Sequence, residues 1–114
     1  MSTVFGKIVR GELPCQKVFE NDRILAFKDI HPQAPVHILI IPKKEIPNLQ
    51  SVQMEDLPLI AEIAQVAQHL AKEFDIDEDG YRFMTNNGSD AGQIVEHLHF
   101  HLIGGKQLSH FGVG

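Results

Sequence analysis

The alternation of polar and apolar residues along segment 95–103 constrains the fold more than any other feature of the sequence. Side chains of a β-strand point alternately to opposite faces of a sheet. As a strand, this segment places His97, His99 and His101 on one face, with successive histidines about 6.5–7 Å apart. A helix would scatter these histidines around its circumference, so the pattern predicts a β-strand. The apolar residues between them then face a hydrophobic core, namely Leu98, Phe100 and Leu102.

Hydrophobic periodicity predicts the other elements. An uninterrupted apolar run is typical of a buried strand, and a stripe with a period near 3.6 is typical of a helix, here with Pro58 in its first turn. Because the strands cluster and do not alternate with helices, we expect an α+β fold on a mainly antiparallel five-stranded sheet. The predicted order is a short helix at 3–10, strands at 17–20, 23–30 and 37–41, a long helix at 55–74, and strands at 81–86 and 95–103.

Length and composition restrict the class of protein. A chain of 114 residues with 43% hydrophobic residues is expected to form one domain, over residues 1–114. The lone cysteine, Cys15, cannot form an internal disulfide, which favours a reducing, cytoplasmic setting. We expect no secretion signal and no membrane span, because no apolar run approaches the required length. The formal net charge of −5 argues against a large nucleic-acid interface, although a few local donors can still hold one phosphate.

Three interpretations of the histidine face are open. A solvated polar surface does not explain why an uncommon residue recurs at alternating positions. A metal site is the second interpretation, since neutral imidazole is a good zinc ligand, and it would use His37, His97, His99 and His101. The third is phosphoryl chemistry, with one histidine as nucleophile and its neighbours as donor and orienter. The strand alone does not separate the second interpretation from the third.

The loop that precedes the histidines favours phosphoryl chemistry. Residues 87–93 are Asn-Gly-Ser-Asp-Ala-Gly-Gln, and small residues let main-chain N–H groups converge on an anion. A zinc site has little use for such a loop, whereas a phosphate does. A histidine nucleophile must also be neutral, and clustered imidazoles disfavour each other's charge.

Three segments together resemble the histidine triad (HIT) family. The His97-x-His99-x-His101 motif with its approach segment 92–96 carries the family signature. Segment 29–43, Asp-Ile-His-Pro-Gln-Ala-Pro-Val-His-Ile-Leu-Ile-Ile-Pro-Lys, is similar to the Hint branch of that family, as are segment 5–10 and the Gly104-Gly105 pair. The resemblance covers about residues 4 to 107. It implies a single HIT domain, a homodimer whose two sheets join into one, and no cofactor or resident metal.

The resemblance also implies an activity, the cleavage of purine nucleoside phosphoramidates through a nucleotidyl-histidine intermediate. His99 would be the nucleophile, and His101 would donate to the phosphate or to the departing group. His97 would fix the tautomer and orientation of His99, and His37 would complete the histidine cluster.

Further residues are assigned to nucleotide binding by the same resemblance. Asp29 would accept hydrogen bonds from the ribose hydroxyls. The base and sugar pocket would be lined by Phe5, Ile8, Phe27, Ile30 and Leu39. The phosphate side would be reached by Asn86, Gly92, Gln93 and the main chain of Ile94 and Val95.

Two positions depart from the Hint pattern. Ile94 stands where many members carry a hydroxyl or acidic residue, and the tail 106–114 has no tryptophan. Leu108, His110 and Phe111 are the candidates to take over the role of that tail; otherwise the leaving-group specificity differs. Other functions stay open: a dinucleoside polyphosphate hydrolase, suggested by Ala91 before Gly92, a zinc-binding protein, and an interaction module with a vestigial active site.

Overall fold

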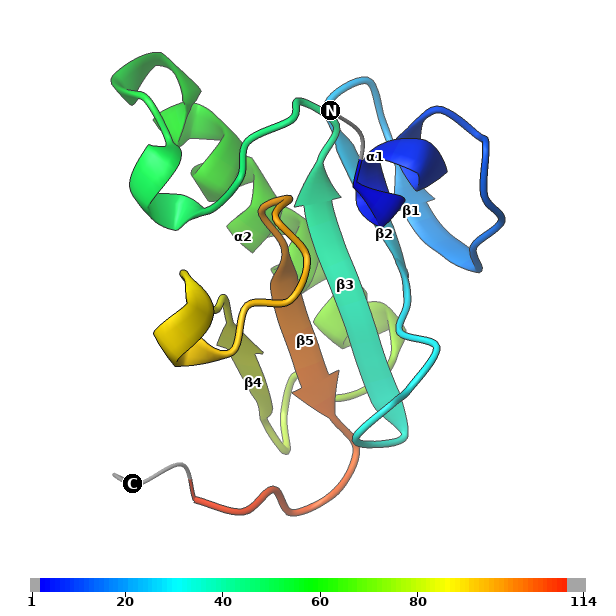
Figure 1. Ribbon diagram of the computed structural model, residues 1–114. Coiled ribbons are helices and arrows are strands. Elements are labelled where there is room, and N and C mark those ends of the chain that lie inside the picture. Colours follow the sequence, from blue (N-terminus) through cyan, green and yellow to red (C-terminus); the bar gives the residue numbers. More distant parts are fainter. Residues whose placement is uncertain (1–2, 111–114) are drawn as a thin grey trace.

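The computed structural model describes residues 3–110 and has a five-stranded sheet at its centre (Figure 1). The strand order is β1-β2-β3-β5-β4, and all four neighbouring pairs are antiparallel. This arrangement confirms the predicted α+β fold. The strands are β1 (Lys17–Glu20), β2 (Ile24–Lys28), β3 (Val36–Pro42), β4 (Tyr81–Met84) and β5 (Phe100–Gly104).

Two α-helices accompany the sheet, α1 (Val4–Val9) and α2 (Leu57–Glu73). The Thr3 side chain caps α1 by accepting a hydrogen bond from the Gly6 N–H at 3.1 Å. The long helix begins two residues later than predicted, because the preceding residues form a separate 3₁₀ turn. No helix in residues 3–110 is both long enough and apolar enough to cross a membrane. Three 3₁₀ turns complete the elements: η1 (Leu49–Ser51), η2 (Met54–Asp56) and η3 (Ser89–Ala91).

The two helices cover opposite faces of the sheet (Figure 1). On the α2 face, one large cluster joins the helix to the central strands, and Leu98, Phe100 and Leu102 belong to it as predicted. On the α1 face a smaller cluster surrounds Phe5, which comes from the short helix. The strand residues of this smaller cluster are Leu25, Phe27, Leu39 and Ile41.

The prediction that all three histidines lie on one strand is wrong in part. Strand β5 begins at Phe100, so only His101 belongs to it, and His97 and His99 lie in the approach to it. The ladder ends there because its hydrogen-bonding groups are used elsewhere. The Leu98 N–H donates to the Ile46 carbonyl at 2.6 Å, and the His99 carbonyl accepts from the Thr85 hydroxyl at 2.6 Å. The shared face survives, since Phe5 contacts both His97 and His99 edge-on.

Candidate active site

His99 lies at the centre of the site with its proton placed by the main chain. Its Nδ1 is 2.7 Å from the His97 carbonyl oxygen, which can only accept a hydrogen bond. Nδ1 therefore carries the proton, and Nε2 has a free lone pair. Phe5 of α1 packs edge-on against the ring, with centroids 5.0 Å apart, and holds its orientation. The neutral ring consequently presents Nε2 as a nucleophile.

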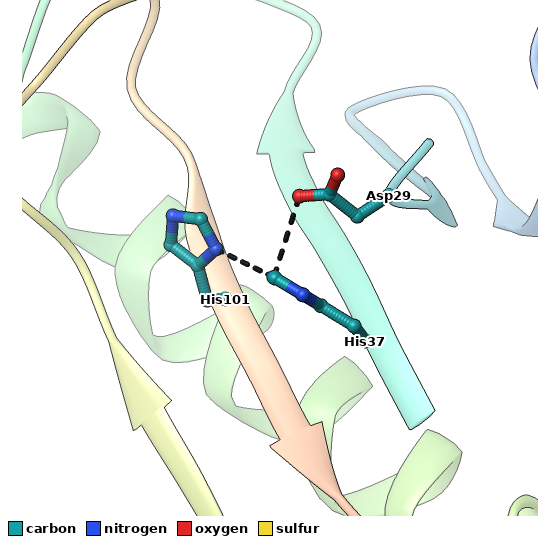
Figure 2. Close-up of side chains that lie close together, drawn as sticks. All are labelled: Asp29, His37 and His101. Atoms are coloured by element: carbon teal, nitrogen blue, oxygen red, sulfur yellow. Dashed lines mark hydrogen bonds and ion pairs between the residues drawn. The ribbon is translucent and has the colours of Figure 1, made fainter. Parts of the chain in front are cut away.

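His101, the next histidine along the chain, has the opposite proton placement. The main-chain N–H of Gln33 donates to His37 Nδ1 at 3.0 Å, so a neutral His37 carries its proton on Nε2. That nitrogen is 2.9 Å from His101 Nδ1, which must then accept (Figure 2). His101 is left with its own proton on Nε2. The ring centroids of His99 and His101 are 5.3 Å apart, so a ring with a free lone pair and a ring with an N–H donor are neighbours.

Asp29 closes this cluster at the end of β2. Its Oδ2 is 3.3 Å from His37 Nε2 (Figure 2). Its Oδ1 accepts from the main-chain N–H of His31 at 2.8 Å. A hydrogen bond of 2.9 Å from the Asp29 N–H to the His37 carbonyl holds the two residues in register. The carboxylate favours the Nε2–H tautomer of His37, because it is a second acceptor for that proton.

The environment keeps all four histidines neutral. Burial lowers the pKa of His37, His97 and His99 below the usual histidine value. The Asp29 carboxylate offsets this in part for His37, and the hydrogen bonds to the carbonyls of Pro42 and His97 offset it in part for His97 and His99, respectively. Burial lowers the pKa of His101 furthest, to about 4, with the neighbouring His99 and His37 adding to the effect. A neutral His99 is the form that a nucleophile requires.

His97 acts on the tautomer of His99, the role predicted for it, through its main chain. Its carbonyl, and not its ring, orients His99. The ring is 1% exposed and donates from Nε2 to the Pro42 carbonyl at 2.8 Å, which ties the approach segment to the end of β3. Its Nδ1 has no hydrogen-bond partner within residues 3–110. The side chain is therefore a structural anchor behind the nucleophile.

Gln93 braces the loop before the histidines. Its Oε1 accepts from the Gly88 N–H at 2.8 Å, and its Nε2 donates to the carbonyls of Pro47 and Val95. Gly88 and Gly92 both have positive φ, which the tight loop requires. No acceptor in residues 3–110 takes the main-chain N–H of Ile94 or Val95. The side chain of Gln93 thus holds the loop while these N–H groups stay available to an anion.

Comparison with known proteins supplies the decisive observation, because the sequence model of the HIT domain matches residues 10–108. The chain belongs to the HIT domain family. It is 53% identical over 106 residues to a HIT-like protein of Chlamydia pneumoniae, covering 93% of this chain and 96% of that protein.

Solved structures of HIT proteins agree with this assignment. The fold is similar to that of a HIT family hydrolase from Legionella pneumophila, with a TM-score of 0.92, 47% identity, and 95% and 96% of the two chains covered. A histidine triad nucleotide-binding protein from Candida albicans has a TM-score of 0.80 at 34% identity, with 96% and 85% covered.

The predicted pocket residues of this HIT protein separate into two groups. Phe5, Phe27 and Leu39 are buried together in the α1-face cluster, and Ile8 packs against it half-buried. Ile30 is not part of that cluster, since 85% of it is exposed. Asn86 is half-buried at the end of β4.

A metal interpretation fits the donor set of this HIT protein poorly. Ligand atoms of Asp29, His37 and His101 lie within 4.8 Å of one another, whereas His97 uses its ring to hold Pro42. Metal-bound imidazole normally donates from its other ring nitrogen. His37 Nδ1 instead accepts from the Gln33 N–H, so its Nε2 bears a proton and has no lone pair for a metal. The cluster is arranged for hydrogen bonding.

The tail leads away from the histidines. Leu108 and His110 line a hollow of about 840 Å³ next to β4, and Arg82 donates to the Ser109 carbonyl at 2.7 Å. Phe111, the third tail residue considered, lies outside the described residues.

Sequence reasoning missed two parts of the site, the main-chain N–H of Gln33 and the carbonyl of Pro42. Both act through the main chain, so no side-chain type signals them. Their only trace in the sequence is that both residues lie inside segment 29–43.

Proposed function

We propose that this protein is a hydrolase of the Hint branch that cleaves purine nucleoside 5′-phosphoramidates through His99. One observation carries the proposal: the neighbouring rings of His99 and His101 carry a nucleophilic lone pair and an N–H donor, respectively. A phosphoryl group needs both, one to attack phosphorus and one to stabilise its oxygens. The hydrolase and nucleotide-binding names of the solved relatives support the same class.

The first step transfers the nucleotide to the enzyme. His99 Nε2 forms a bond to the α-phosphorus, and the P–N bond breaks with its electron pair left on the amine nitrogen, which takes up a proton. The His97 carbonyl stabilises the positive charge that develops on the imidazole, because Nδ1–H donates to it. Products of this step are the free amine and a nucleotidyl-histidine.

The second step releases the nucleotide. A water oxygen bonds to phosphorus, the His99 Nε2–P bond breaks, and its electron pair returns to the ring as a lone pair. The proton lost by the water goes to solvent or phosphate, and the product is a nucleoside monophosphate. His99 is then neutral again, with Nδ1–H still on the carbonyl.

Nucleotide binding uses the rest of the site. The ribose hydroxyls donate to Asp29, which lies 3.3 Å from His37 and is only partly exposed. The purine packs against the α1-face cluster around Phe5 and Phe27, under the exposed Ile30. The phosphate accepts from the N–H groups of Ile94 and Val95, with Asn86 and Gly92 beside the loop.

We further propose a cytoplasmic homodimer joined along β4. This strand is one of the two edges of the sheet, the other being β1, and it lies next to the inner strand β5 with no strand on its outer side in residues 3–110. Sedimentation analysis should give twice the monomer mass of 12.8 kDa. A monomer at micromolar concentration would contradict the dimer and leave the chemistry of His99 untouched.

The test of the activity is the release of a fluorescent amine from an adenosine phosphoramidate. Wild type and His99→Ala are compared, each with and without a chelator. We expect release by wild type that the chelator does not change and that His99→Ala lacks. Diadenosine polyphosphate is assayed in parallel, and preferred cleavage of it would favour the alternative branch. AMP binding without any turnover would contradict the enzymatic proposal.

A further inference from the structure

The chain of hydrogen bonds that ends at His101 has a fixed direction. It begins at the Gln33 main-chain N–H, which can only donate, and passes through His37 Nδ1 and Nε2 to His101 Nδ1. Each imidazole in it accepts on one nitrogen and donates from the other. If the direction were reversed, His37 would carry its proton on Nδ1, and that proton would face the N–H proton of Gln33 with no acceptor between them. The direction is therefore set by a main-chain group that cannot titrate.

This direction limits what His101 can do with its Nε2 proton. To release that proton as an acid and stay neutral, the ring must gain one at Nδ1 from His37. His37 would then need a new proton on Nδ1, where the Gln33 N–H already points. Without that exchange, His101 would become an imidazolate anion, which is far too basic to form beside Asp29. His101 is also not an imidazolium acid at neutral pH, because its pKa is lowered to about 4.

We infer that His101 is a neutral hydrogen-bond donor to a phosphoryl oxygen and not the acid that protonates the leaving group, and that His37 is the positioning residue that holds it in this tautomer. A neutral imidazole can stabilise developing negative charge in this way without any proton transfer. The amine then takes its proton from solvent. The inference rests on the proposed phosphoryl-transfer function.

The direct test is the tautomeric state of each histidine, read from two-bond ¹H–¹⁵N correlations of the imidazole rings in the full chain at neutral pH. We expect Nε2–H on His37 and His101 and Nδ1–H on His99. In His37→Leu, His101 should become a mixture of tautomers. An Nδ1–H tautomer of His101 in the wild type would overturn the inference. This measurement needs no turnover, so its outcome is independent of the proposed activity.

The kinetic test compares two leaving groups, an alkylamine and a 4-nitrophenol, on the same adenosine monophosphoryl group. The phenol needs no proton to depart. We expect His37→Leu to lower kcat by about 10²-fold for both substrates, because a donor to the phosphoryl oxygen serves both. A loss confined to the amine would overturn the inference and identify His101 as an acid.

Two further variants separate positioning from packing. His37→Gln retains an N–H donor near His101 Nδ1 that cannot titrate, so it should recover most of the kcat that His37→Leu loses. His31→Leu replaces an exposed histidine of the same loop and should leave both substrates unchanged. Equal losses in His37→Gln and His37→Leu, with both variants folded, would overturn the positioning role of His37, because a donated hydrogen bond to His101 Nδ1 would then not account for the loss.

Discussion

The two faces of the sheet contrast in what covers them. The α2 face is covered by a helix of 17 residues and packs mainly aliphatic side chains into one cluster. The α1 face is covered by a helix of six residues, which reaches only part of the sheet. The remaining part is occupied by His37, His99 and His101. Adjacent residues of one segment thus serve stability on one face and chemistry on the other.

This contrast shows how a small protein keeps a polar cluster partly buried. The histidines are satisfied mostly by main-chain groups, namely the carbonyls of Pro42 and His97 and the N–H of Gln33. Rigid strands beneath them supply those groups at fixed positions. The apolar face therefore supports the reactive one, because it keeps the main chain in place.

The largest expected effects come from two separate substitutions, one on each face: His99→Ala for turnover and Leu98→Ala for stability. His99→Ala should lower kcat by about 10⁴-fold or more, since the nucleophile is lost. Leu98→Ala should lower the free energy of unfolding by about 2–5 kcal/mol, because it opens a cavity on the α2 face, where Leu98 is 1% exposed. Turnover of the phosphoramidate and urea denaturation measure the two effects. If both variants lost turnover and stability to a similar extent, the two faces of the sheet would not differ in role.

His97→Ala is the next test, because this residue connects the two roles. Removing the ring leaves the Pro42 carbonyl unpaired and opens a buried space, so we expect a loss of about 2–4 kcal/mol in unfolding free energy. The carbonyl that orients His99 remains, so kcat should fall far less than in His99→Ala. Denaturation and turnover are measured on the same preparation. A kcat as low as that of His99→Ala would assign the ring a direct role in catalysis.

Acid should destabilise the protein through the histidine face. The unfolded chain takes up protons on these histidines near pH 6.5, whereas His37, His97 and His99 have lowered pKa values and that of His101 is about 4. Between these values the unfolded state binds more protons than the folded state, so the free energy of unfolding decreases as the pH is lowered. We expect a loss on the order of 2 kcal/mol from pH 7 to pH 4.5 by urea denaturation. His101→Gln should flatten this dependence; an unchanged slope would place the titrating groups elsewhere.

The smallest effect lies at the end of α2. Asp75 follows the helix with φ of 59°, and the Ile76 N–H closes the turn on the Ala71 carbonyl at 2.8 Å. Asp75→Gly should raise the free energy of unfolding by up to about 1 kcal/mol, because glycine adopts this conformation without strain. Thermal unfolding measures it, with Asp77→Gly as the matched control, which should bring no gain. Equal shifts in the two variants would exclude backbone strain as the cause.

Patterns of side chains predicted most of the fold. The apolar run of β3 and the stripe of α2 appear where their periods place them, and Leu98, Phe100 and Leu102 face the core. The start of β5 was wrong, because the alternation continues through His97 and His99 while the ladder does not. Periodicity reports which way side chains point, and it is blind to which main-chain groups find partners.

The same reason limits what the sequence reveals of the site. The alternating histidines and segment 29–43 correctly indicated that His37 and His101 meet. The placement of the protons on His37 and His101 depends on the amide of Gln33, which every residue type except proline could supply. The placement of the proton on His99 depends on the carbonyl of His97, which any residue type could supply. Such contacts follow only from the folded main chain.

The amide of Gln33 has a consequence for how this site tolerates genetic drift. Its side chain is exposed, so most codon changes at this position leave the amide unaltered. Proline is the exception, because it alone removes the N–H. Position 33 should accordingly look variable among functional descendants of this sequence while excluding a single amino acid. Conservation scores would rank it low, although it controls where the protons of two histidines reside.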